Sequence, residues 1–297
     1  FDSIKYEVDQ KKRPGRFLLL GSTEFSKLTL IRESLTGRMG RIRLYHLSLQ
    51  ESLGSGALKH GAVAPCKRAD LLRYLKNGGL PGICFIRDEE EQNALFQDWI
   101  DLTCFRDLQQ FKTLKLDSEI AYQCLKATAT LNEPTVSNIA NSIGVDARRV
   151  TTHLRALSEL FVTQRLDPHP SGTGKSIFLP FDVGVAGYLG ASLVRRLHIW
   201  ILNERLVFNS CFEEKRSSFF YYRSTGKKMI HVVEEPLNGG IIAHQLVDHE
   251  NLKKTDAELM KAFLVKNPKA KSVVYAPLTH ATSIQGISFA PWESGAS

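Results

Sequence analysis

The sequence predicts an α/β fold interrupted by a helical middle section. Apolar runs of strand length, such as Phe17–Leu20, alternate with amphipathic stretches of helix length before residue 50 and again after residue 168. Between residues 132 and 167, two helical stretches joined at Gly144 come directly before a short strand. Hydrophobic residues make up 43% and charged residues 24% of the 297 positions, which excludes disorder, collagen and coiled coil as the main class.

The first 50 residues have the pattern helix, strand, helix, strand. Residues 1–10 predict the end of an amphipathic helix, and Phe17–Leu20 predicts a buried strand. Ser22 or Thr23 can cap the helix that follows, and residues 41–47 alternate as a strand does. The apolar face of that helix would consist of Phe25, Leu28, Ile31 and Leu35. This order predicts the final part of a parallel α/β sheet.

The middle section, residues 51–168, is expected to be mostly helical. A Gly- and Ser-rich loop at 52–63 comes before helices at 69–76, 88–110 and 117–131. The most informative part is 132–167, where a helix at 136–143, the Gly144 turn, a second helix capped by Asp146 and a short strand follow one another. The inner face of the second helix would be formed by Val150, Leu154 and Leu157. This order is the layout of a winged helix-turn-helix.

The remaining residues predict a second α/β domain at 169–290, with a loose tail at 291–297. Helices are expected at 185–208 and 255–265. Strands are expected at 176–181, 219–222, 229–233, 240–247 and 272–275, the third and fourth of them joined as a hairpin.

The charge and the cysteine content limit the classes to which the protein can belong. The net charge is +8, and residues 1–60 contribute +5 of it, with 11 Lys and Arg against 6 Asp and Glu. Five widely spaced cysteines without a C-x-x-C pair predict neither a disulfide framework nor a zinc ribbon, and fit a reducing cytoplasm. No apolar run approaches a membrane span, so we expect neither a signal peptide nor a membrane partner, and a cytoplasmic protein. Because the sequence begins with Phe1 instead of Met, we expect it to start inside a longer protein.

Several strings, in their order and spacing, resemble those of a large prokaryotic family of predicted AAA+ ATPases with an uncharacterised, nuclease-like C-terminal domain. The strings are GRFLLLGSTEF (15–25), SLTGRMGRIRLYHLSLQE (34–51), GGLP (78–81), FRDL (105–108), FDVG (181–184), NERLV (203–207) and YYRSTGKKMIHVV (221–233). The resemblance implies that residues 1–50 are the end of an AAA+ module. It also implies that the P-loop and the acidic Walker B strand belong upstream of Phe1, so ATP and Mg²⁺ are expected only with that missing part.

In such a module Ser22 would be the polar sensor residue near the γ-phosphate, and Arg38 could meet phosphate charge. Alternatively, Ser22 only caps a helix and Arg38 is a solvated residue at a helix end. Gly174-Lys175-Ser176 ends like a P-loop, but His169 stands where the first glycine is required and a strand follows instead of a helix. We therefore do not expect nucleotide binding there.

The winged-helix stretch offers a second function. Arg148, Arg149, Thr152 and Arg155 would point away from the inner face of its second helix, where they could contact DNA phosphates or bases. However, residues 131–166 carry only 4 Arg against 3 acids, and winged helices also serve as packing or protein-docking modules.

The last domain resembles the PD-(D/E)-x-K nucleases, in which an Asp and a Glu hold Mg²⁺ and a Lys positions the water. Here Ile230 stands at the Asp position, Gln245 at the Glu position and Val247 at the Lys position, so we expect a degenerate, inactive site. Glu204 alone matches an acidic position, and we expect it to make a surface ion pair. No spacing among His231, His244, Asp248 and His249 matches a metal motif, so no metal site is expected.

Together these expectations describe the C-terminal part of an AAA+ ATP-binding protein with a regulatory or partner-binding role and no catalytic residues of its own. The alternative is a DNA-binding winged-helix regulator. DNA or a protein is the expected partner, and the sequence leaves the oligomeric state open.

Overall fold

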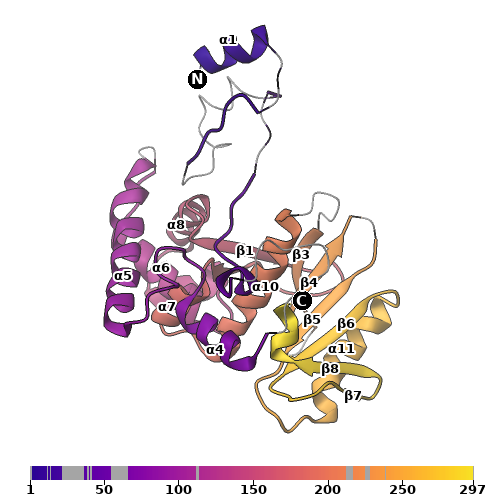
Figure 1. The fold of residues 1–297 in the computed structure, drawn as a ribbon. Coiled ribbons are helices and arrows are strands. Elements are labelled where there is room, and N and C mark those ends of the chain that lie inside the picture. Colours follow the sequence, from indigo (N-terminus) through magenta and orange to yellow (C-terminus); the bar gives the residue numbers. More distant parts are fainter. Residues whose placement is uncertain are drawn as a thin grey trace.

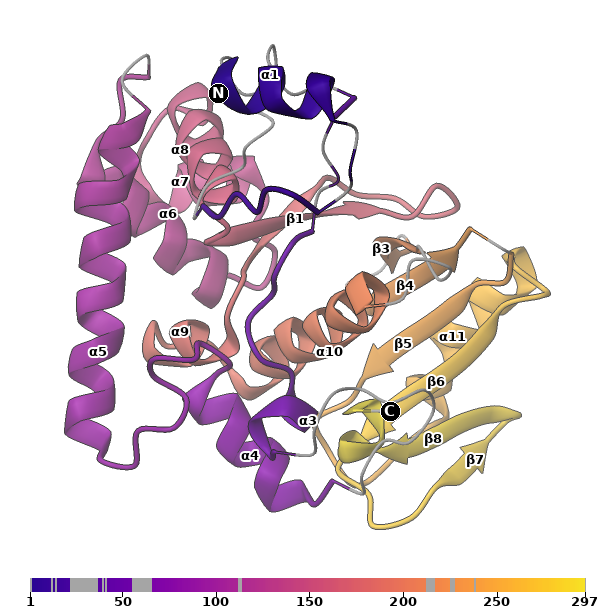
Figure 2. The ribbon, with the colours of Figure 1, turned by 45° about the horizontal axis from the view of Figure 1, so that its top comes forward.

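The computed structural model confirms a mixed α/β fold (Figure 1). It describes residues 2–11, 13, 15–21, 37–38, 40, 42–54, 66–111, 114–211, 217–224, 228–237 and 239–296. The first helix, α1 (Asp2–Gln10), buries none of its residues. The described chain from residue 46 onward forms a body in which helices gather at one end of a sheet (Figure 2).

The sheet has eight strands in the order β2-β1-β3-β4-β5-β6-β8-β7. Their bounds are β1 Thr163–Pro168, β2 Ile177–Pro180, β3 Ser217–Arg223, β4 Met229–Pro236, β5 Ile242–Leu246, β6 Lys271–Ala276, β7 Thr282–Ile284 and β8 Ile287–Pro291. The pairs β1–β3, β5–β6 and β6–β8 are parallel, and the other neighbours are antiparallel. The β4–β5 pair confirms the hairpin expected around residues 236–239.

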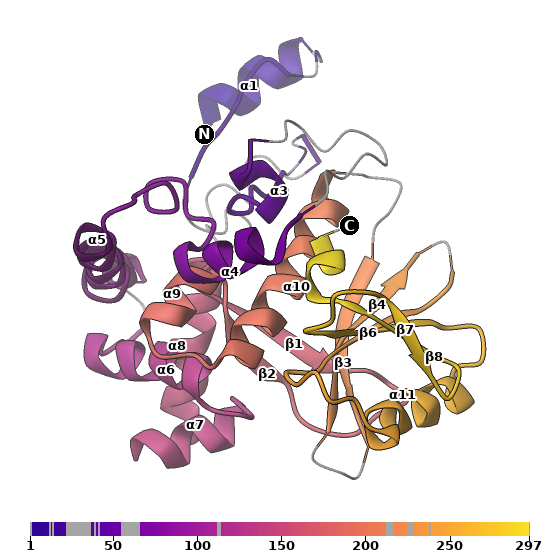
Figure 3. The same cartoon turned by 60° about the horizontal axis from the view of Figure 1, so that its bottom comes forward.

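Helices α10 (Leu193–Cys211) and α11 (Lys254–Lys266) pack on opposite faces of this sheet (Figure 3). Successive strand residues point to opposite faces, and the neighbours Val232 and Val233 accordingly belong to the two different hydrophobic cores. Trp200 of α10 is fully buried in the first core and Phe263 of α11 in the second. The central strands are therefore covered on both sides, as their apolar runs predict.

The helical section contains the expected helices, most of them capped by a side chain. It consists of α3 (Leu49–Ser52), α4 (Arg68–Asn77), α5 (Glu89–Asp101), a π turn (Leu102–Arg106), a 3₁₀ turn (Asp107–Gln110), α6 (Ser118–Thr130), α7 (Val136–Ile143), α8 (Ala147–Glu159) and α9 (Val183–Tyr188). Asp88, Asp117, Thr135 and Asp146 accept hydrogen bonds from the first-turn amides of α5, α6, α7 and α8.

Helices α6, α7 and α8 pack together, and the β1–β2 hairpin follows directly. Gly144 adopts φ 66° between α7 and α8, which confirms the glycine turn expected there. Thr135 forms an isolated antiparallel bridge with Ile177 of β2, so the start of α7 is bonded to the hairpin. Strand β1 also joins β3, which makes the sheet continuous across the domain boundary expected at residue 168.

Two expectations about secondary structure were wrong. Residues 17–20 and 42–47 form no strand, because the described part of the chain places no neighbouring strand beside them. The helix expected after Ser22 lies outside the described residues.

The C-terminal tail is not loose. Residues Trp292–Ala296 form a 3₁₀ turn in which Trp292 is buried and its indole N–H donates to the Val247 carbonyl at 2.9 Å. Strands β7 and β8 were also not expected. They are joined by Gln285 and Gly286, with φ 54° and 81°, which is the left-handed pair that a two-residue hairpin turn needs.

Candidate functional site

Residues 42–49, here named the connecting segment, join the N-terminal residues to the body (Figure 2). The Leu47 amide donates to the Gly79 carbonyl at 2.9 Å, and the Tyr74 hydroxyl donates to the Leu47 carbonyl at 2.6 Å. His46 donates from Nε2 to the Phe181 carbonyl at 2.7 Å. A Cβ at position 79 would collide with the Leu47 carbonyl oxygen, so the close approach requires glycine there.

Further contacts on α10 complete the joint, as we name the contacts between the connecting segment and the body. The Leu49 amide donates to Glu204 Oε1 at 2.7 Å, and the Trp200 indole donates to the same oxygen at 3.1 Å. Glu204 is buried, and this burial raises its pKa to about 7. The expected surface ion pair at Glu204 was therefore wrong: this carboxyl fixes the backbone of the connecting segment.

Strings that are far apart in the sequence meet at this joint. The carboxylate of Asp182, in FDVG, accepts from the amides of Gly79, in GGLP, and Gly184, both at 2.8 Å. The Asn203 amide, in NERLV, donates to the Phe181 carbonyl at 2.7 Å. Together with the bond between Leu49 and Glu204, these contacts bring four of the strings quoted above into one hydrogen-bonded cluster.

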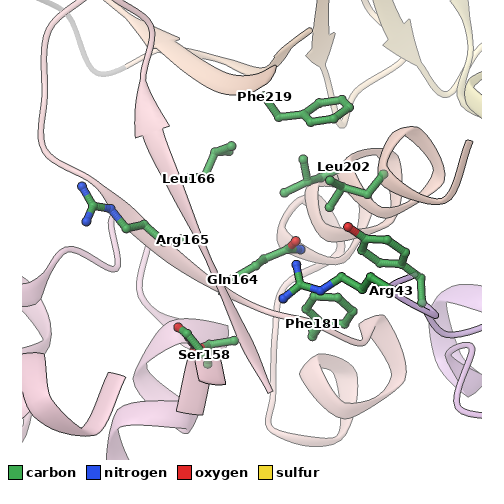
Figure 4. A pocket seen from close by; sticks show the side chains of 11 residues that line it. Arg43, Ser158, Gln164, Arg165, Leu166, Phe181, Leu202 and Phe219 are labelled. Atoms are coloured by element: carbon green, nitrogen blue, oxygen red, sulfur yellow. Dashed lines mark hydrogen bonds between the residues drawn. The ribbon is translucent and has the colours of Figure 1, made fainter. Parts of the chain in front are cut away.

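A cleft of about 300 Å³, here named the Arg43 cleft, opens beside the joint (Figure 4). Its walls come from the connecting segment, the end of α8, strand β1, α10 and β3. The lining residues are Arg43, Tyr45, Ser158, Thr163, Gln164, Arg165, Leu166, Phe181, Leu202, Leu206 and Phe219.

Aromatic rings hold the Arg43 side chain at the cleft. Its guanidinium carbon lies 4.3 Å from the ring centre of Phe161, 5.8 Å from that of Tyr45 and 5.9 Å from that of Phe181. The Tyr45 and Phe181 rings are stacked with centres 5.5 Å apart. Phe161 reaches Arg43 from a left-handed backbone conformation, φ 58°, which is strained for an aromatic residue.

Beside Arg43 the cleft carries a fixed amide. Gln164 Nε2 donates to Asn203 Oδ1 at 2.9 Å, and Asn203 in turn donates to the Phe181 carbonyl. The Ser158 and Thr163 hydroxyls lie 3.0 Å apart at the base of the hairpin. Figure 4 shows Arg43 and Gln164 near each other in the centre, Leu166 and Phe219 above them, and Arg165 directed away from the group.

Of the two expected nucleotide-sensing residues, the structure describes only Arg38. Ser22 lies outside the described residues. The exposed Arg38 binds the Asp9 carboxylate, with N–O distances of 2.7 and 3.0 Å. Ser176, in the P-loop-like string, bonds Asp167 and is followed by strand β2, which confirms the strand expected there.

The expected DNA-facing residues lie together on α8. Arg148, Arg149 and Arg155 are exposed, whereas Thr152 is half-buried and donates from its hydroxyl to the Arg148 carbonyl at 2.9 Å. Arg149 lies 3.8 Å from the Asp117 carboxylate, and Arg155 pairs with Glu159 at 3.1 Å. The helix therefore offers an arginine row that nearby acids partly neutralise.

The four positions matched to the nuclease motif do not converge. Ile230 and Val247 belong to the core on the α11 side, and Gln245 donates to the Asp256 carbonyl of α11 at 3.2 Å. Glu204 belongs to α10, which covers the opposite face of the sheet. The side chains that would form one site are thus divided between two faces.

The histidines near these strands mostly have structural roles. The Leu246 amide donates to Nδ1 of the buried His231 at 3.1 Å, and Nδ1 of the buried His244 lies 3.3 Å from the Tyr275 hydroxyl. Partly exposed His249 pairs with Asp256 at 3.0 Å. Among the described residues, no group of three or more His, Cys, Asp or Glu side chains could hold a metal ion.

Sequence reasoning did not find the Arg43 cleft. Its available signal was the alternation Arg43-Leu44-Tyr45, which predicts a strand equally well. The partners of these side chains lie more than 100 residues away, at Phe161 and Phe181, so no local pattern could reveal them.

Comparison with known proteins identifies relatives of undetermined function. A family model described as a domain of unknown function, DUF8612, matches residues 68–179. Two curated proteins described as uncharacterized, one from Mycobacterium bovis and one from Mycobacterium tuberculosis, are each 28% identical to this chain over 177 residues. These alignments cover 59% of this chain and 37% of each relative, so the chain spans little more than a third of their length. No solved structure gives a significant match.

The helices of the described residues were also compared with the requirements of a bilayer. None of them is both long enough and apolar enough to cross a membrane.

Proposed function

We propose that this chain is the partner-binding, non-hydrolysing part of an AAA+-type ATP-binding protein, and that the connecting segment links an upstream nucleotide-binding module to the body. The observation that carries the proposal is the contrast between the two sides of Tyr45 along the chain. The residues after it are bonded into the body, whereas large apolar residues before it are exposed.

The exposed residues have the character of an unpartnered sheet segment. Leu18, Leu20, Ile42 and Leu44 are between 77% and 84% exposed. Burying one such side chain contributes about 1.5 to 3 kcal/mol, so covering these four by another part of the protein would stabilise that contact. The strings GRFLLLGSTEF and GRMGRIRLYHLSLQE resemble the end of an AAA+ module, whose parallel sheet would cover these side chains.

The joint supplies the physical basis for coupling. The connecting segment is bonded to Tyr74 of α4, to the Phe181 carbonyl just before α9 and to Glu204 of α10. A displacement of residues before Arg43 would therefore be transmitted to helices that cover both the helical section and the sheet. The sequence contains no G-x-x-x-x-G-K-[ST] string, so the expected role is regulatory and not hydrolytic.

The coding region upstream of residue 1 provides the test. We expect it to encode a P-loop followed by an acidic strand, and the longer protein to hydrolyse ATP. Replacing Leu18, Leu20, Ile42 and Leu44 together by Ser in that protein should lower its ATP turnover at least about tenfold, with Leu72→Ser as a matched control on exposed α4. An upstream region without a P-loop, or turnover unchanged in the fourfold variant, would contradict the proposal.

A second candidate function is DNA binding through a winged helix. Two observations support it: the order α6, α7, α8, β1, β2 with the Thr135–Ile177 bridge, and the exposed arginine row on α8. The hairpin is joined to β3 along one edge, which leaves α8 as the surface that would meet the duplex.

This candidate is tested by titrating labelled duplex DNA at low and high salt. If α8 binds DNA, the affinity should fall steeply with salt, and Arg148→Ala with Arg149→Ala should remove most of it. Arg106→Ala, an exposed arginine away from α8, serves as the control. Binding that survives the double substitution would assign the contact elsewhere.

We also propose that the strands β3 to β6 and their helices are a nuclease-like fold that has lost its chemistry. The apolar side chains of Ile230 and Val247 support this, since neither can bind Mg²⁺ or position water. Incubation with duplex and single-stranded DNA or RNA in Mg²⁺ or Mn²⁺ should give no cleavage. Cleavage that disappears in Glu204→Gln would contradict the proposal.

A further inference from the structure

A serine, a histidine and a glutamate that none of the functions above uses form one chain of hydrogen bonds. The Ser171 hydroxyl lies 2.7 Å from His169 Nδ1, and His169 Nε2 lies 2.7 Å from Glu235 Oε1. Ser171 and His169 belong to the loop between β1 and β2, whereas Glu235 belongs to β4. The fold therefore brings together a hydroxyl, an imidazole and a carboxylate, which are the three groups of a serine hydrolase triad.

The hydrogen bonds around the imidazole assign the position of its proton. The Ser171 amide donates to His169 Nδ1 at 3.2 Å, so this nitrogen is an acceptor and the neutral ring carries its proton on Nε2. Nε2 then donates to the Glu235 carboxylate, and the lone pair of Nδ1 faces the Ser171 hydroxyl. In this state the ring can accept the proton of the serine, with Nδ1 in the role that Nε2 has in most serine hydrolases.

The backbone of the loop is fixed on β3. The His169 amide donates to the Tyr221 carbonyl at 2.7 Å, and the Thr173 amide donates to the Arg223 carbonyl at 2.9 Å. The Gly172 amide donates to the His169 carbonyl at 2.8 Å. A Cβ at position 172 would come within 3.0 Å of the Arg223 carbonyl oxygen, so this close approach favours glycine. Ser171 is therefore held between bonded residues on either side.

The imidazole itself is also held in place. His169 is 4% exposed, and its ring meets the rings of Phe220 and Phe263 edge to face, with centres 5.7 and 5.6 Å apart. Ser171 and Glu235, at the two ends of the hydrogen-bond chain, are half-buried. A base fixed by packing beside a hydroxyl that solvent reaches is the arrangement that nucleophilic catalysis requires.

The end of α11 contributes two further polar groups. Asn267 Nδ2 donates to Ser171 Oγ at 3.3 Å, so the hydroxyl accepts from Asn267 and directs its own proton to His169. Lys266 Nζ donates to the Ser171 carbonyl at 3.2 Å. This ammonium places a positive charge beside Ser171, where negative charge develops when a serine attacks a carbonyl group.

We propose that Ser171, His169 and Glu235 form a hydrolytic site for small carboxylic esters, with Ser171 as the nucleophile. An ester is the class of substrate because its alcohol is a better leaving group than the nitrogen of an amide. Glu235 is a positioning residue, since it contacts His169 and not the ester. The site is independent of the proposed ATPase ancestry, and its chemistry does not involve ATP.

The reaction has two steps. Ser171 Oγ forms a bond to the carbonyl carbon while its proton moves to His169 Nδ1, and the C–O bond to the alcohol then breaks as the alcohol takes that proton. The acyl group remains on Ser171. Water then attacks the acyl carbon and gives a proton to His169, which returns it to Ser171 Oγ as the carboxylic acid leaves.

The test uses the purified chain, p-nitrophenyl acetate and a fluorophosphonate probe that modifies reactive serines. We expect p-nitrophenol to be released faster than in buffer, and mass spectrometry to find the probe on Ser171. Ser171→Ala should lower the rate at least about tenfold and abolish this labelling. Ser176→Ala, which changes a half-buried serine of the same loop bonded to Asp167, should alter the rate less than about twofold.

Glu235→Gln tests the positioning residue separately from folding. The amide keeps an oxygen for His169 Nε2, so the thermal unfolding midpoint should stay close to that of the wild type. Because the uncharged amide stabilises the protonated imidazole less, the maximal rate of labelling should fall at least about tenfold. The probe concentration that gives half of this rate should change less than about twofold, since Glu235 does not contact the probe.

Three results would overturn the proposal. The first is no p-nitrophenol release above the buffer rate together with no labelling of Ser171. The second is hydrolysis that persists unchanged in Ser171→Ala, which would assign the reaction to another nucleophile. The third is labelling of a folded Glu235→Gln variant at the wild-type rate, which would leave the three side chains with a structural role only.

Discussion

The N-terminal residues and the C-terminal turn both carry large apolar side chains, but only the C-terminal turn buries them. Leu18 and Leu44 are more than 80% exposed, whereas Trp292 is 5% exposed and its indole N–H is bonded to Val247. This difference shows that an apolar side chain is buried only where other parts of the protein are placed to cover it. Trp292 finds a prepared site beside the sheet, and the N-terminal leucines lack one among the described residues.

The largest effect that tests this comparison is expected at the C-terminal turn. Trp292→Ala should reduce the free energy of unfolding by about 3 to 5 kcal/mol, because it opens a cavity and leaves the Val247 carbonyl without its donor. Chemical denaturation measures the change. Trp292→Phe, which keeps a ring but loses the N–H, should cost clearly less, and equal losses in the two variants would contradict the packing explanation.

The next effect concerns the joint at Glu204. Burial raises its pKa to about 7 from the ordinary value of 4.5, so the folded state holds a proton that the unfolded state releases between these values. The folded state therefore loses about 2 kcal/mol of stability as the pH rises from 5 to 8. Glu204→Gln keeps an oxygen for Leu49 and Trp200 and should abolish this contribution. If the stability of Glu204→Gln depended on pH in the same way as that of the wild type, Glu204 would not be buried in solution.

A pH effect of similar size and opposite direction is expected from the buried His244. Burial, with Arg205 nearby, lowers the pKa of His244 to about 3, so the folded state keeps this ring neutral while the unfolded state binds a proton below about pH 6.5. Stability should therefore fall by about 2 kcal/mol for this residue between pH 7 and pH 5. Denaturation midpoints at the two pH values in the wild type and His244→Asn isolate the effect. If the wild type and His244→Asn lost the same stability between the two pH values, the burial of His244 would be contradicted.

The smallest effect is expected at the exposed leucines. Replacing Leu18, Leu20, Ile42 and Leu44 by Ser should change the free energy of unfolding by less than about 0.5 kcal/mol, because these side chains are surface positions in this chain. A loss of several kcal/mol would show that they pack against the body after all. The contrast with Trp292→Ala is therefore measurable in one experimental series.

Much of the fold follows from local pattern. The bounds of α4, α6, α7, α8 and α11 agree closely with the apolar spacing and the cap residues, since a helix is specified by neighbours three and four residues apart. Strands β7 and β8 and the buried Trp292 could not be found in this way. Their stability depends on Val247 and β6, which lie elsewhere in the chain.

The candidate site shows the same limit. Glu204 was identified from the resemblance as an acidic position, but its role was misjudged because the bond to Leu49 joins residues separated by 155 positions. Residues 17–20 and 42–47 have a strand pattern that is real in composition but has no sheet to join within the described chain. The periodicity of a segment indicates that it can form a strand, but the strand forms only where a neighbouring strand is present.

The central proposal, that this chain does not hydrolyse ATP by itself, is tested most directly by phosphate release from the purified chain with Mg²⁺ and ATP. The account predicts a rate no higher than the buffer background, and the same rate in Lys175→Ala, since Lys175 belongs to a hairpin and not to a phosphate-binding loop. Turnover in the range of known ATPases that Lys175→Ala abolishes would contradict it.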